Sequence, residues 1–125
     1  MSIASQVFAA AVAALHVLIF LMESVLWMRP DVHRRFGVRS VADAEGVRRF
    51  AFNQGFYNLF LAIGIALGLV LWHSGQPVAG RTLVIFGCAC VLAAALVLVG
   101  SDRRMWRAAL IQGAPAALAL ALAAF

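Results

Sequence analysis

The chain has 125 residues, of which 65% are hydrophobic and only 12% are charged, and its mean hydropathy is +0.97. A soluble domain has about 45–50% apolar and about 25% charged residues, so this composition excludes an ordinary soluble domain. The net charge of +5 comes entirely from arginine, without any lysine. We expect the arginines to set membrane topology and contact anionic lipid headgroups, and we expect no nucleic-acid partner.

Four long blocks that are nearly free of charge predict an all-α bundle of four antiparallel transmembrane helices. A crossing helix needs about 20 apolar residues, so four helices and short loops use the whole chain. We therefore expect one integral membrane domain over residues 1–125. The expected spans are about 3–28, 53–72, 82–100 and 106–124, with a cytoplasmic loop at 29–52.

The arginine positions predict the orientation of the helices. Only Arg81 lies in the second loop. The positive-inside rule puts the first and third loops in the cytoplasm and both termini outside, which predicts a multi-pass membrane protein. The other arginines lie in or beside those two loops: Arg29, Arg34, Arg35, Arg39, Arg48, Arg49, Arg103, Arg104 and Arg107.

The first span contains a histidine and an acid. No positive residue precedes its apolar run, so we expect a retained helix rather than a signal peptide. Glu23 lies six residues before Arg29, at a depth where a carboxylate is costly and usually faces a bundle interior or water. On an ideal helix, His16 lies within about 20° of the same face and about 10 Å away. We expect these two side chains to share one stripe.

The first loop contains a helix-start pattern. Ser40 followed by Asp43 predicts a second helix that begins near Val41 and continues into the bilayer. His33 in this loop and His73 at the far end of the second helix are expected to be solvated.

The tryptophans and cysteines have ordinary membrane interpretations. Trp27 and Trp106 are expected at the inner interface and Trp72 at the outer one, as an aromatic belt. Cys88 and Cys90 point about 200° apart on one helix, so we expect them to act as small hydrophobes without pairing.

The start of the second span is unusually polar. Asn53, Gln54, Tyr57 and Asn58 lie within an arc of about 140° on an ideal helix. Small residues mark helix–helix contact faces, and two glycines extend the same arc. We therefore expect this face to look into protein. The two glycines are Gly64 and Gly68.

The fourth span also carries a polar side chain, at nearly the same depth in the membrane as those of the first and second spans. Gln112 lies five residues from Arg107, much as Gln54 and Glu23 lie five and six residues from their own flanking arginines. Pro115 frees a backbone carbonyl beside Gln112. The short turn at 101–104 predicts that the third and fourth helices are antiparallel neighbours. The sequence thus predicts one polar cavity near the cytoplasmic side.

Several of these motifs resemble one bacterial family, catalogued as domain of unknown function 1304. They are Leu15-His16 and Met22–Trp27 in the first helix, the string "NQGFYNLFLA" from Asn53 to Ala62, and "QGAP" at 112–115. The resemblance covers nearly the whole chain. It implies a multi-pass, four-helix protein of the bacterial inner membrane and no established activity. Small multidrug-resistance transporters and emopamil-binding sterol isomerases are similar only in general design.

The predicted cavity leaves three functions open. The leading hypothesis is binding or transport of a small ligand or proton, with ligand-binding residues listed below and a homodimer if anything larger than a proton crosses. The second is a membrane enzyme on a lipid-like substrate, with Glu23 and His16 as catalytic acid and base. The third is a non-catalytic structural subunit. We expect no metal or other cofactor, because no ligand cluster is visible. The predicted ligand-binding residues are Glu23, His16, Asn53, Gln54, Tyr57, Asn58 and Gln112.

Overall fold

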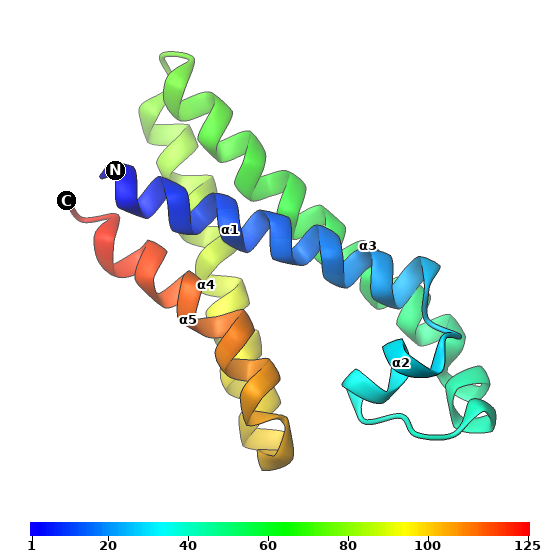
Figure 1. The fold of residues 1–125 in the computed structure, drawn as a ribbon. Helices are drawn as coiled ribbons and strands as arrows, with labels where there is room; N and C mark the ends of the chain where they lie inside the picture. Colours follow the sequence, from blue (N-terminus) through cyan, green and yellow to red (C-terminus); the bar gives the residue numbers. More distant parts are fainter. The chain divides into compact units, whose positions relative to one another are not determined.

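The apolar blocks form helices, and no strand occurs in the computed structural model, which describes all residues 1–125 (Figure 1). Four of its helices are long and apolar enough to cross a membrane, which confirms the all-α architecture with four transmembrane helices. The elements are α1 (Ile3–Phe20), the π-helix η1 (Leu21–Val25), α2 (Pro30–His33), the 3-10 helix η2 (Arg34–Phe36), α3 (Val41–His73), α4 (Pro77–Ser101), the 3-10 helix η3 (Arg103–Met105) and α5 (Trp106–Leu122).

Local sequence signals explain where the helices begin. The Ser40 hydroxyl accepts a hydrogen bond from the Asp43 amide at 3.0 Å, and α3 begins at Val41 as predicted. At 33 residues, α3 is about 50 Å long, more than the hydrocarbon core of a bilayer needs. Its first turns therefore extend beyond the apolar span. Helix α4 begins at Pro77, earlier than the expected 82, because proline suits the first turn of a helix.

The first helix ends differently from the prediction. Regular α-helix stops at Phe20, a π-helical turn follows, and the helical segment ends at Val25 rather than near residue 28. The Leu26 amide donates to the Leu21 carbonyl at 2.8 Å, which is the i to i+5 bond of a π-helix.

The chain forms two compact units, and α1 and α3 each contribute a segment to both. We call residues 1–15 and 62–125 the bundle unit, because it contains part of every long helix. We call residues 16–61 the loop unit, because it contains the first loop with the helical segments that flank it.

Side-chain hydrogen bonds join the first and last helices of the bundle unit. The Ser2 hydroxyl donates to the Leu122 carbonyl at 3.0 Å, and the buried Ser5 hydroxyl donates to the Ala119 carbonyl at 2.8 Å. The start of α1 therefore lies beside the end of α5, and the two helices run antiparallel. Both chain termini lie at the same end of this unit, as an even number of crossings requires (Figure 1). That this end faces outward stays a prediction.

Close backbone contacts join α3 to α4 in the bundle unit. A Cβ atom on Gly80 would lie 2.4 Å from the Trp72 amide nitrogen and 2.6 Å from the Gly68 carbonyl oxygen. Only a residue without a side chain allows this approach. Gly68 is therefore a contact residue as expected. The same expectation for Gly64 is wrong, because a Cβ atom on Gly64 would meet nothing within 4 Å.

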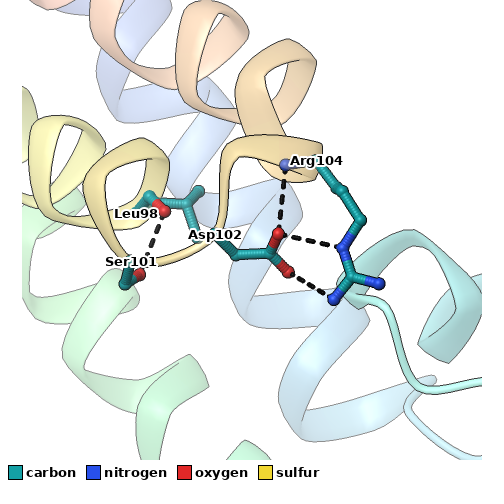
Figure 2. A network of polar contacts seen from close by, with 4 residues as sticks. All are labelled: Leu98, Ser101, Asp102 and Arg104. Carbon is teal, nitrogen blue, oxygen red and sulfur yellow. Dashed lines mark hydrogen bonds and ion pairs between the residues drawn. The ribbon is translucent and has the colours of Figure 1, made fainter.

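The turn between α4 and α5 is short, and in it Asp102 forms an ion pair with Arg104 (Figure 2). The Asp102 carboxylate accepts hydrogen bonds from the Arg104 amide at 3.0 Å and from its guanidinium at 3.1 and 3.3 Å. These bonds from Arg104 hold the pKa of Asp102 below its usual value of 3.8. The prediction that α4 and α5 are antiparallel neighbours is confirmed by their packing, in which Gly113 contacts Ala95.

Candidate functional site

The acid of the first span lies in the irregular part of its helix. Glu23 is the central residue of the π-helix η1 and is only 7% exposed. A π-turn contains more residues per turn than an α-helix, so the angular argument that put Glu23 on the stripe of His16 applies only as far as Phe20. Single-turn π segments occur frequently at functional sites, and no local sequence signal announced this one.

Asn58 of α3 contacts this acid. Its side-chain amide donates to Glu23 Oε2 at 3.3 Å and to the Gln54 carbonyl one turn earlier at 3.1 Å. Asn58 is only 9% exposed. The structure therefore brings together two of the predicted site residues, from the first and second spans, within the loop unit.

A close contact beside the acid sets the distance between η1 and α3. The Ser24 hydroxyl donates to the Phe52 carbonyl at 2.7 Å. A Cβ atom on Gly55 would lie 1.9 Å from Ser24 Oγ and 3.1 Å from the Ser24 amide nitrogen, so the glycine is required here. Sequence reasoning singled out neither Ser24 nor Gly55 as a functional position, although both belong to the quoted family motifs.

An open pocket of about 450 Å³ lies beside Glu23 within the loop unit. Asn53, Gln54 and Tyr57 form part of its lining and are exposed, Tyr57 by 68%. The expectation that their helix face looks into protein is thus wrong for these three, and correct for Asn58. The full lining is Glu23, Trp27, Phe36, Val47, Phe50, Ala51, Asn53, Gln54 and Tyr57.

Trp27 joins the first loop to α3 at this pocket. It is 6% exposed, its indole nitrogen donates to the Ala44 carbonyl at 2.9 Å, and its ring centroid lies 5.4 Å from that of Phe36. Trp27 is therefore held by protein contacts, and its place in an interfacial aromatic belt stays a prediction. Its donor is satisfied by protein, so it presents ring surface to the pocket.

His33 also departs from expectation. It was expected to be solvated, but it is completely buried, and its ring centroid lies 6.2 Å from that of Trp27. Its Nδ1 hydrogen-bonds the Val38 carbonyl. His73, by contrast, is exposed as expected, with its Nε2 2.7 Å from Gln6 Oε1 in the bundle unit.

Besides Asn58, two predicted site residues are not part of the lining of this pocket. His16 is buried on α1, and its participation with Glu23 stays a prediction. Gln112 is half-buried on α5, in the bundle unit, and its place beside Glu23 also stays a prediction. No group of three or more metal-ligating side chains is gathered in the chain, and both cysteines are free thiols.

A second open pocket, of about 570 Å³, lies on the first turns of α3. Its lining includes Glu45, Arg48 and Arg49, and Arg48 Nη1 lies 3.7 Å from Glu45 Oε2. The basic side chains of α3 thus line a different pocket from the one beside Glu23.

Comparison with known proteins identifies the family. A family model described as "Protein of unknown function (DUF1304)" matches residues 10–124. The chain therefore belongs to this family, and the resemblance seen in its sequence motifs is confirmed. A search of curated proteins and a search of solved structures each give no match.

Proposed function

We propose that this member of the DUF1304 family binds a small ligand in the pocket beside Glu23, and that this binding is one step of its transport across a membrane. The observation that carries the proposal is the hydrogen bonding of the acid. A carboxylate has about four acceptor positions. Asn58 occupies one of them, from 3.3 Å, and Glu23 also lines the pocket. The remaining positions are available to a ligand or a proton.

A purely structural role explains this acid poorly. An acidic side chain inside a membrane costs about 2.5–3.5 kcal/mol on insertion scales. A neutral glutamine could accept the same hydrogen bond from Asn58 at lower cost, and such interhelical bonds contribute only about 0.6 kcal/mol on average. The free-energy cost of placing Glu23 in the membrane is therefore better explained by a function in which its carboxyl group gains and loses charge.

The neighbouring side chains would orient the ligand. Asn53 and Gln54 offer amide donors and acceptors at the edge of the pocket, and Tyr57 offers both a hydroxyl and a ring. In this proposal, Glu23 holds either a proton or the positively charged part of a ligand, one replacing the other. His16, which belongs to the same loop unit, is proposed as a further member of the site.

We further propose that the protein resides in the bacterial inner membrane with both termini outside, because nine of its ten arginines flank two loops. Reporter fusions at the C-terminus and in the turn at 74–76 would test this orientation.

The pocket is open in a single chain, which favours a homodimer during transport. Cross-linking in native membranes would test the dimer.

Proton flux in liposomes tests the proposed function. Purified protein would be reconstituted around the pH-sensitive dye pyranine, and a pH step applied with and without candidate metabolites outside. We expect ligand-stimulated flux that Glu23→Gln abolishes and Glu45→Gln preserves. Glu45 is a matched control, because it is an exposed acid of the same unit that does not line this pocket.

Thermal unfolding supplies the second readout. A bound ligand raises apparent stability, and the rise should depend on pH when Glu23 is present. If Glu23→Gln leaves fold, ligand-induced stabilisation and flux unchanged, the residue is structural and the proposal is wrong.

A further inference from the structure

From the lining of the pocket beside Glu23, we infer that its ligand is a small organic cation that carries apolar groups. This inference rests on the proposed function and names the class of ligand. It begins from charge: Glu23 is the one acid among the nine lining residues, and no arginine, lysine or histidine is among them. A carboxylate without a basic neighbour in a pocket disfavours an anion and favours a cation.

No arginine lines this pocket, although the segment between the first and second spans contains many arginines. Six arginines lie between positions 29 and 49. Arg48 and Arg49 line the other pocket, where Arg48 is paired with Glu45. None of the six lines the pocket beside Glu23, so no basic side chain in that lining opposes a positive ligand.

Aromatic rings make up much of the remaining lining. Trp27, Phe36, Phe50 and Tyr57 all border the pocket, and the Trp27 and Phe36 rings meet at an angle of 56°. Ring faces attract organic cations, above all quaternary ammonium groups, and they also bury apolar substituents. The Trp27 donor is already bonded to Ala44, so this ring contributes its face rather than a hydrogen bond.

The same lining argues against a hard divalent cation. Hard divalent ions need about six or more oxygen ligands. The pocket offers one carboxylate, the amides of Asn53 and Gln54 and the Tyr57 hydroxyl among apolar side chains, which is fewer oxygen ligands than such an ion needs. Its volume of about 450 Å³ suits an organic molecule, since ligand pockets measure about 300–1,000 Å³.

A set of three probes of matched shape tests the inference. Phenyltrimethylammonium is the cation, tert-butylbenzene replaces its nitrogen by carbon, and benzenesulfonate carries the opposite charge. The full chain with Trp72→Phe and Trp106→Phe, in lipid nanodiscs, retains Trp27 as its single tryptophan. Its fluorescence therefore reports binding at the pocket, after correction for probe partition into protein-free nanodiscs.

We expect phenyltrimethylammonium to bind at least about tenfold more tightly than tert-butylbenzene, a difference of about 1.4 kcal/mol. Benzenesulfonate should bind most weakly. Glu23→Gln should remove the preference for the cation, and Glu45→Gln should preserve it. Phe50→Leu, at a side chain that is 74% exposed and so unimportant for folding, should weaken the cation several-fold and leave the neutral probe nearly unchanged.

The outcomes separate the two proposals. Equal binding of the charged and neutral probes, or preference for benzenesulfonate, overturns the inference of a cationic ligand and leaves ligand binding in place. Trp27 fluorescence that no probe changes also overturns the inference. The proposed function fails only if the liposome flux is also independent of Glu23.

Discussion

Replacing Gly55 by alanine should separate η1 from α3 and disturb the acid next to it. The added Cβ would lie 1.9 Å from Ser24 Oγ, 3.0 Å from Ser24 Cβ and 3.1 Å from the Ser24 amide nitrogen. Rotating the serine hydroxyl away would break its 2.7 Å bond to the Phe52 carbonyl. The contacts with Ser24 Cβ and with the backbone would still remain too short, so the two helices must move apart.

The expected loss of stability follows from three contributions. Overpacking a well-packed contact costs about 1–3 kcal/mol. Loss of the Ser24 hydrogen bond costs about 1 kcal/mol. Alanine recovers up to about 1 kcal/mol, because glycine is a poor helix former. Gly55→Ala should therefore lower the free energy of unfolding by about 1–3 kcal/mol.

Denaturation in mixed micelles, followed by tryptophan fluorescence, would measure this loss. The matched control is Gly46→Ala on the same helix, where nothing lies within 4 Å of the added Cβ. The control should be neutral or stabilising by up to about 1 kcal/mol. In the double variant Ser24→Gly/Gly55→Ala the hydroxyl and Cβ of Ser24 are gone, so its loss should be smaller than the sum of the single losses by about 1 kcal/mol or more.

Two results would refute this reasoning. One is a Gly55→Ala protein as stable as Gly46→Ala. The other is strict additivity in the double-mutant cycle, since residues without a shared contact add within about 0.5 kcal/mol. Either result would mean that η1 and α3 do not meet at Ser24 and Gly55, and that Glu23 is positioned by something else.

The remaining predictions concern other contacts. Gly80→Ala should cost about 3 kcal/mol or more in the same denaturation assay, because its Cβ would meet the Trp72 backbone at 2.4 Å, which no side-chain rotation can relieve. Ser5→Ala, at a buried interhelical hydrogen bond, should cost only about 0.6 kcal/mol. Asp102→Asn should remove a pH-dependent contribution to stability. Because Arg104 lowers the pKa of Asp102 in the folded state, that contribution is present above pH 3.8 and is lost as the pH falls through the lower folded value, which acid titrations of both proteins would reveal.

The fold was largely predictable because a membrane leaves few choices. In lipid, every backbone polar group must be bonded internally, so long apolar blocks become helices whatever their detailed sequence. The start of α3 was predictable for a similarly local reason, since Ser40 and Asp43 lie three residues apart and bond each other. Signals of this kind need no knowledge of the other helices.

The candidate site was only partly predictable, because its geometry depends on contacts between distant segments. The sequence pointed to both Glu23 and Asn58, and the structure joins them. Helical angles alone could not tell that Tyr57 would be exposed. The burial of His33 could not be predicted either. It depends on the contact between its ring and that of Trp27, which is itself bonded to Ala44 of α3.

The π-turn connects these features physically. Consecutive residues on a π-helix are separated by a smaller angle than on an α-helix, so two neighbours can face the same partner helix. Here Ser24 bonds the Phe52 carbonyl while Glu23 accepts a bond from Asn58, and both partners lie on α3. On a regular α-helix these neighbours would differ by about 100°, so the π-turn brings the directions of the two side chains closer together. The packing of Ser24 against Gly55 thus helps to hold the neighbouring acid within hydrogen-bonding reach of Asn58.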